Sequence, residues 1–169
     1  MPYFIKGEKI KMAIINNGLY DTDYLIGIHD IASQTVLADS VIEIGDVYRK
    51  YCRKNRCGTP VYSNTSTGVT LQRSGVYKVT ATLVGTGTEA GDVTVQLFSN
   101  GSPVAGAIST QTITTADTEF RTFTIDTFIL VNNGEVLGYN STLAQTLTLE
   151  NTGVGATFTN VVLNIVKVL

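Results

Sequence analysis

Alternation of apolar and polar residues is the feature that most limits how this chain can fold. In residues 77–83 every second position is apolar and the positions between are Thr or Lys. The same alternation recurs in residues 93–97, 122–126 and 147–150. Side chains of a β-strand point alternately to its two faces, so each segment is predicted to be a strand with one buried face. Since no helical period lies between them, the sequence predicts an all-β antiparallel sandwich or barrel.

Two Asn-Gly pairs mark where the chain is expected to reverse. Asn100-Gly101 follows the segment 93–97, and Asn132-Asn133-Gly134 precedes residues 135–139. Asn and Gly tolerate the positive φ angles that a two-residue hairpin turn requires of its central residues. Both places are therefore predicted to be tight turns.

The last apolar segment, residues 157–169, differs from the others because both of its faces are apolar. One face carries Val161, Leu163 and Ile165, and the other is predicted to carry Phe158, Val162, Val166 and Val168. A strand with one face in water would not carry apolar residues on both. The second face is covered either by a loop of the same chain or by another subunit, and we favour another subunit. Those four residues are the predicted trimer interface.

The charge of the chain excludes several kinds of partner. Only 15% of the residues are charged, 12 are Lys or Arg, and the formal net charge is -2. A chain-wide basic surface for nucleic acid is therefore excluded. No apolar run approaches the ~18 residues that a membrane helix needs, so no membrane partner is expected. Near the N-terminus, charged residues occupy positions that are apolar in a signal peptide. Secretion through a signal peptide is therefore not expected.

Few residues are suited to catalysis or to metal binding. The chain has one histidine, His29, and two cysteines, so neither a Ser-His-Asp arrangement nor a four-ligand zinc site is expected. His29 is interpreted as a surface or interface residue. Asp117, Glu119 and Asp126 are candidates for the two carboxylates of a glycosidase, but Asp117 and Glu119 lie beside a Thr-rich turn and are interpreted as solvated. The chain is predicted to be non-enzymatic, with no cofactor and no metal.

One short segment is basic. Five of residues 49–56 are Lys or Arg, and tyrosines lie beside them. Such a segment could contact phosphates, an acidic partner or only solvent, and a solvated turn is favoured because the chain has no second basic patch. Cys52 lies within this segment and Cys57 directly follows it, with four residues between the two. This spacing leaves open a small-loop disulfide or two free thiols, and we favour the disulfide.

Composition divides the chain in two. Residues 58–169 hold 23 threonines and four basic residues, whereas the first 40 residues contain short apolar pieces broken by turn residues. We therefore predict an N-terminal segment, residues 1–40, and a β domain, residues 41–169. The N-terminal segment is interpreted either as an anchor that binds another protein or as an extension wrapped over its own domain. The anchor is slightly favoured.

Three motifs resemble the TNF-like and complement globular-head jelly roll. Residues 71–80, LQRSGVYKVT, resemble its Gly-x-Tyr strand, and residues 95–101, VQLFSNG, resemble the following strand that ends in Asn-Gly. The Thr-Phe-Thr of residues 157–159 lies in a segment similar to the strand that closes the domain. The resemblance covers about residues 40–169. It implies an antiparallel jelly-roll sandwich and a homotrimer packed about the C-terminal strand.

The Arg-Lys-Tyr-Cys and Cys-Gly-Thr-Pro sequences ahead of this domain also resemble small proteins of bacteriophages and prophages. This implies a structural protein of the virion surface, made in the host bacterial cytoplasm. It would be a trimeric head fibre or capsid decoration protein whose N-terminal segment binds the capsid or another virion protein. One alternative is a tail or baseplate tip that binds a host surface glycan or receptor. Another is a TNF-like protein of a bacterial surface or spore layer.

Overall fold

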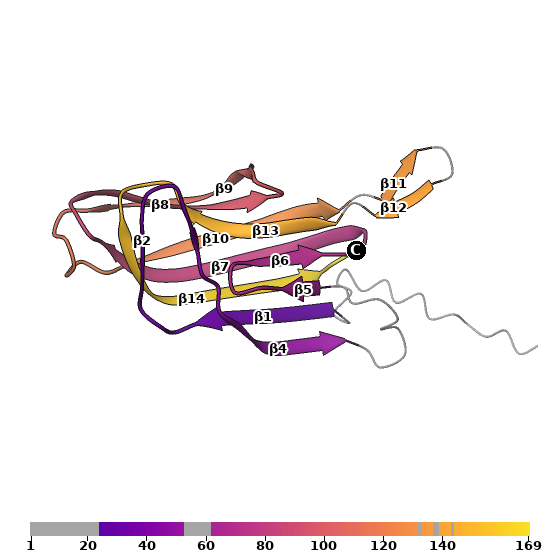
Figure 1. The fold of residues 1–169 in the computed structure, drawn as a ribbon, viewed down its shortest axis with the longest axis horizontal. Coiled ribbons are helices and arrows are strands. Elements are labelled where there is room, and N and C mark those ends of the chain that lie inside the picture. Colours follow the sequence, from indigo (N-terminus) through magenta and orange to yellow (C-terminus); the bar gives the residue numbers. More distant parts are fainter. Residues whose placement is uncertain (1–23, 53–61, 132, 137–138, 143) are drawn as a thin grey trace, which may run out of the picture.

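The computed structural model describes residues 24–52, 62–131, 133–136, 139–142 and 144–169, and strands in these ranges form two large sheets. Sheet A has the order β10 (Arg121–Val131), β7 (Gly75–Gly87), β14 (Ala156–Lys167), β1 (Tyr24–Asp30), β4 (Asp46–Cys52), and the short β2 (Gln34–Val36) also pairs with β14. Sheet B has the order β5 (Tyr62–Asn64), β6 (Gly68–Leu71), β13 (Gln145–Asn151), β8 (Gly91–Ser99), β9 (Ser102–Ile113), and β3 (Ser40–Ile42) also pairs with β13. A hairpin of β11 (Asn133–Val136) and β12 (Tyr139–Thr142) projects from one end (Figure 1).

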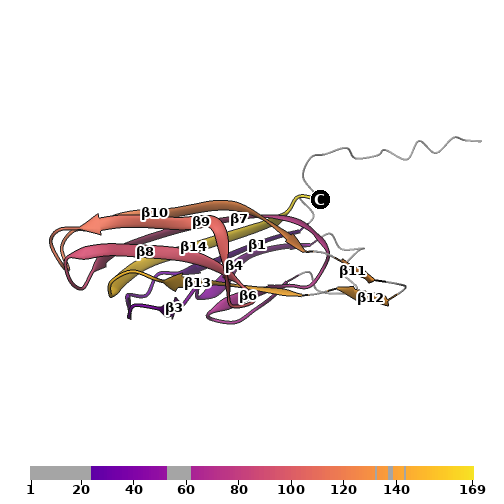
Figure 2. The same ribbon diagram turned by 90° about the horizontal axis from the view of Figure 1, so that it is seen from above.

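The two sheets form two layers, and the chain crosses repeatedly from one layer to the other (Figure 2). It crosses from β6 to β7, from β7 to β8, from β9 to β10 and from β13 to β14. Every pairing between the described strands is antiparallel. The predicted all-β antiparallel sandwich is therefore confirmed, and the repeated crossings are those of a jelly roll.

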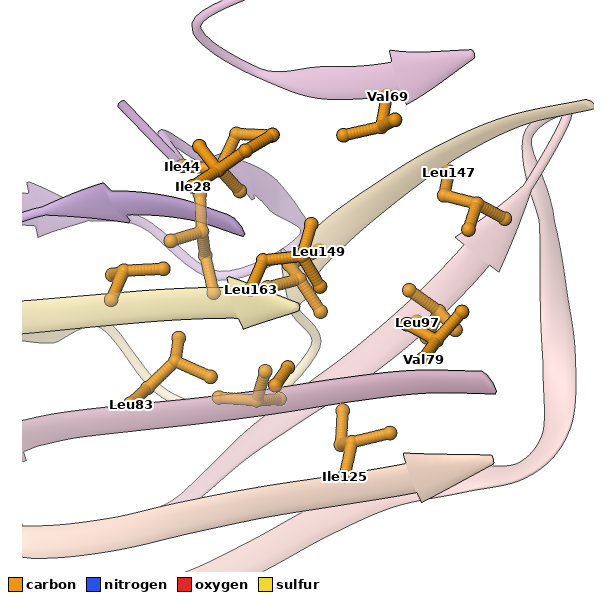
Figure 3. Close-up of a cluster of buried hydrophobic side chains, with 14 of the residues drawn as sticks. Ile28, Ile44, Val69, Val79, Leu83, Leu97, Ile125, Leu147, Leu149 and Leu163 are labelled. Atoms are coloured by element: carbon orange, nitrogen blue, oxygen red, sulfur yellow. The ribbon is translucent and has the colours of Figure 1, made fainter. Parts of the chain in front are cut away.

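The space between the sheets is filled by the apolar residues whose alternation predicted the strands. Those of β7, β8, β10 and β13 are all buried: Tyr77, Val79, Ala81, Leu83, Val93, Val95, Leu97, Phe123, Ile125, Ile129, Leu147 and Leu149. Figure 3 shows side chains of this core converging from strands of both sheets. Burial of one large apolar side chain stabilises a fold by roughly 1.5–3 kcal/mol, so this core is the main source of stability.

One of the two predicted turns is confirmed. Asn100 and Gly101 have φ angles of 50° and 74° between β8 and β9, as a hairpin turn with two left-handed residues requires. The turn predicted at Asn132-Asn133-Gly134 is wrong. Asn133 and Gly134 belong to β11 and pair with β12, and the chain reverses after Val136 instead. An Asn-Gly pair permits a tight turn, but it also accepts an extended conformation when a partner strand is present.

The sandwich begins before the predicted boundary at residue 40. Strand β1 lies between β14 and β4 in sheet A, and β2 extends the same edge of β14 (Figure 1). Ile26 and Ile28 of β1 are fully buried. Residues 24–28, YLIGI, show no polar alternation because their outward positions carry Leu and Gly, so the pattern did not indicate a strand. Residues 1–23 lie outside the described part, and their role as an anchor stays a prediction.

The place of β1 predicts how truncated chains will behave. A chain of residues 24–169 should unfold cooperatively, whereas a chain of residues 41–169 should fail to fold because β14 and β4 lose the strand between them. The measurement is urea unfolding followed by circular dichroism. Equal urea midpoints for the two chains would restore the boundary at residue 40.

A matched pair of point variants tests the same conclusion in the full chain. Ile28→Ala should lower the free energy of unfolding by about 2–5 kcal/mol, as deletion of a buried aliphatic side chain does. Ile31→Ala, just beyond β1 at an exposed position, should change it by less than about 0.5 kcal/mol.

Candidate functional site: the outer face of sheet A

The outer face of sheet A, which points away from sheet B, is made of rows of side chains fixed by the strand register. One row runs across β10, β7, β14 and β1 as Phe128, Lys78, Val166 and Leu25. The next row is Asp126, Thr80, Asn164 and Gly27, and the third is Thr124, Thr82, Val162 and His29. Lys78 and Asp126 form an ion pair of 3.2 Å across the first two rows.

The end of this face nearest the C-terminus is apolar. Phe128 and Leu130 of β10 are 61% and 55% exposed. Leu130 pairs with the half-buried Val76, and the row of Phe128 continues through Val166 to Leu25. An exposed apolar patch of this kind on one sheet face indicates a contact with another protein surface. Val162 and Val166 of the predicted trimer interface lie on this face, and their contact with a partner stays a prediction.

The other two residues of that predicted interface are placed differently. The pairing of β14 with β7 shifts by one residue between Phe158 and Asn160, so Phe158 points inward with Val161 and not outward with Val162. Its fully buried ring packs edge-on against Phe123, with 5.9 Å between ring centroids. The prediction that Phe158 shares a face with Val162 and Val166 is therefore wrong. Val168 is also buried within the chain.

Tyr48 of β4 lies across the middle of the same face. Its hydroxyl donates a hydrogen bond of 2.9 Å to Oδ1 of Asn164 on β14. Its ring lies 5.0 Å, centroid to centroid, from that of His29 on β1. His29, predicted to be a surface or interface residue, lies on this face. Tyr48 was not predicted as a site residue, because a tyrosine between Val47 and Arg49 carries no signal of its position.

Two of the three candidate carboxylates, Asp126 and Glu119, are held by neighbouring residues. Asp126 is paired with Lys78, as described above. Glu119 closes the loop between β9 and β10. Its Oε2 accepts hydrogen bonds from the Thr114 amide (2.7 Å), the Thr114 hydroxyl (2.8 Å) and the Thr115 amide (3.2 Å). Glu119 also forms an ion pair with Arg121. The Thr114 amide is the main cause that lowers the pKa of Glu119 to about 2. Glu119 therefore stabilises a turn as an anion at neutral pH.

A hollow of about 360 Å³ lies between β2 and β3. Its lining residues are Gln34, Thr35, Val36, Leu37, Ser40, Val41 and Glu43. The side-chain amide of Gln34 is already engaged, because it donates to the Glu43 carbonyl (2.8 Å) and accepts from the Glu43 amide (2.9 Å). The hollow thus has one titratable lining residue, Glu43, and no acid–base pair.

Several predictions concern residues outside the described part. Cys57 and residues 53–56 of the basic segment fall there, as does the side chain of Cys52, so the disulfide stays a prediction. Among the described residues, no three His, Cys, Asp or Glu side chains are grouped to hold a metal ion. In the same ranges, no helix has the length and apolar character to cross a membrane.

Comparison with known proteins identifies the fold. No family model and no curated protein matches the sequence. The globular domain of zebrafish complement 1qA protein matches the structure with a TM-score of 0.55 at 9% identity, over 86% of this chain and 98% of that one. Murine APRIL (pH 5.0) matches with a TM-score of 0.56 at 9% identity, over 85% of this chain and 98% of that one. Eiger TNF from S. frugiperda matches with a TM-score of 0.57 at 14% identity, over 85% of this chain and 92% of that one. The predicted resemblance is confirmed: the described domain is a TNF-like and C1q-like jelly roll.

The low pKa of Glu119 predicts how stability depends on pH. Because the folded protein lowers this pKa from 4.5 to about 2, the stabilisation is complete above 4.5 and is lost as the pH falls toward 2. Glu119→Gln should therefore lower stability at pH 7 and weaken its decline between pH 4.5 and pH 2. Urea unfolding across this range measures both, with Glu89→Gln on the β7–β8 loop as control. Parallel curves for the wild type and Glu119→Gln would contradict the prediction.

Proposed function

We propose that this chain is a non-enzymatic structural protein of a bacteriophage particle, displayed on the virion surface as a homotrimer. In this proposal the subunits pack through the outer face of sheet A. The most specific form of the proposal is a head fibre or capsid decoration protein.

The observation that carries the trimer is the difference between the two outer faces of the sandwich. On sheet B, two pairs of outward threonines hydrogen-bond to each other across strands. Thr94 and Thr110 are 3.0 Å apart, and Thr70 and Thr146 are 2.9 Å apart. The corresponding positions of sheet A carry the exposed apolar residues of β10 together with Val162 and Val166 of β14.

This difference has a physical reason if only one face meets water in the assembled protein. Hydroxyl groups that bond to their neighbours can also bond to water, so the threonine face is suited to solvent. Apolar side chains gain free energy when another surface covers them, at roughly 25 cal/mol per Å² of apolar area. A second copy of the chain is the partner that the resemblance to TNF-like domains implies, since those domains assemble as homotrimers.

The virion part of the proposal rests on the sequence resemblance to phage head-fibre, decoration and tail-associated proteins. A chain whose described residues form one small sandwich is suited to display on a particle. Residues 1–23, which precede β1, are the proposed attachment segment. Since β1 begins at the same end of the sandwich as the C-terminus, an attached segment would leave the opposite loops outward (Figure 1).

Analytical ultracentrifugation at micromolar concentration tests the trimer. The wild type should sediment with a mass of about 54 kDa, three times the 18.1 kDa of the chain. Val166→Asp should sediment as a monomer, because it would bring an additional carboxylate from each subunit, beside Lys78, into the apolar contact, where removing a charge from water is costly. Thr110→Asp on the outer face of sheet B is the control and should remain trimeric. A monomeric wild type would overturn the proposed assembly.

Immunogold labelling of purified particles from an induced lysate of the host tests the location. Gold on the particle head is the expected result, and particles assembled with residues 24–169 alone should lose the label. Label at the tail would favour a receptor- or glycan-binding tip. Label on the bacterial envelope and none on particles would overturn the virion proposal.

A further inference from the structure

We propose that Tyr48 is a preformed anchor of the contact between copies of this chain, held in place by a glycine that its ring covers. This inference rests on the proposed homotrimer and adds the residue on which the contact is expected to depend most. It is carried by the backbone of β4, by Gly27 of β1, and by the hydrogen bond to β14.

The backbone of β4 brings Tyr48 to the outer face of sheet A. The pairing of β1 with β4 shifts between Gly27, which is opposite Arg49, and Ile28, which is opposite Val47. Tyr48 is the extra residue of this bulge. A bulge re-aims the side chain of the extra residue, and here it turns the tyrosine over the neighbouring strand.

Gly27 supplies the space that the ring occupies. A Cβ atom at Gly27 would lie 2.8 Å from Cζ and 2.9 Å from the hydroxyl oxygen of Tyr48. Such distances are shorter than carbon atoms tolerate, so any larger residue at position 27 would push the ring away. The ring therefore lies directly on the backbone of β1, and its position depends on the absence of a side chain there.

The far end of the ring is fixed as well. The hydroxyl is bonded to Asn164, and the His29 ring stands on one side at a tilt of 41°. Contacts from β1 and β14 thus hold a side chain that belongs to β4. A side chain already held in one conformation loses little entropy when a partner covers it, which raises its contribution to binding.

In spite of these contacts, Tyr48 remains 47% exposed. Tyrosine is among the residues that carry most of the binding energy of protein interfaces, because it combines a large apolar surface with a polar end. Here the hydroxyl already donates to Asn164, so a partner can cover the ring without breaking that hydrogen bond.

The partner expected on this ring is a second copy of the chain. Asn164, which accepts the hydrogen bond from Tyr48, stands between Val162 and Val166 on β14, so the ring lies beside the row that runs from Phe128 through Lys78 to Val166. Lys78 and Asp126 of this face form an ion pair, and Arg49, opposite Gly27, adds a charge beside the ring. A fixed aromatic ring between an apolar end and such polar groups is suited to a subunit contact, because interfaces combine an apolar centre with a polar rim.

The test compares trimer dissociation constants, measured by sedimentation over a concentration series of the full chain. Tyr48→Ala should raise the dissociation constant at least about tenfold, which is the size expected for an interface residue of this kind. Gly27→Ala should do the same while leaving the tyrosine in the sequence. Tyr48→Phe keeps the ring and loses only the hydrogen bond, so its effect should be smaller.

Ile108→Ala is the matched control, because Ile108 is 49% exposed on the outer face of sheet B and should not affect assembly. Urea unfolding of each variant separates loss of assembly from loss of folding. If Gly27→Ala has a lower free energy of unfolding than the wild type, the dissociation constant of Tyr48→Ala decides the test. That variant truncates a half-exposed side chain and is therefore expected to fold. A trimer that Tyr48→Ala leaves as tight as the wild type would overturn this inference and leave the homotrimer intact. A monomeric wild type would overturn the homotrimer itself.

Discussion

The pairing of β14 along both of its edges is the constraint on which the rest of the sandwich depends. One edge pairs with β7 from Ala156 to Lys167, and the other pairs first with β2 and then with β1. The N-terminal strands β1 and β2 are thereby joined to β14, the C-terminal strand, at the centre of sheet A. With its backbone groups bonded on both sides, β14 can present one row of side chains to the core and another to the outer face. The positions of the outward residues of β7, β14 and β1 follow from this register.

The two sheets use the same strand geometry for different surfaces. Both bury their inward rows in one core, so the core does not distinguish them. Their outward rows differ in part, because sheet B carries two threonine pairs that hydrogen-bond across strands. Sheet A carries Phe128, Leu130, Val162 and Val166 beside threonines and the Lys78–Asp126 ion pair. The fold would tolerate polar residues at those positions of sheet A. The apolar side chains there are thus explained by a partner surface better than by folding of the single chain.

The sequence predicted a strand correctly where its alternation of apolar and polar residues is regular. In β7, β8, β10 and β13 a polar residue stands at nearly every outward position, so the alternation predicted both the strands and their buried residues. Strand β1 was missed because its outward positions hold Leu25 and Gly27, which leave no contrast with the buried Ile26 and Ile28. At Asn133-Gly134 the residues fit a turn and a strand equally. Those errors arise where local sequence is compatible with two structures and the pairing partner decides.

The bulges in β14 and β4 explain why the outer face of sheet A was harder to predict than the core. A one-residue shift in pairing exchanges the two faces of a strand, and no residue type announces where it occurs. In β14 the shift after Phe158 moves an aromatic ring from the expected outer face into the core, where it packs on Phe123. In β4 the shift at Tyr48 does the reverse and sets a ring on the outer face over Gly27. The side chains on the outer face of sheet A are thus positioned by bulges in β14 and β4. Where each bulge occurs is determined by the pairing with the neighbouring strands.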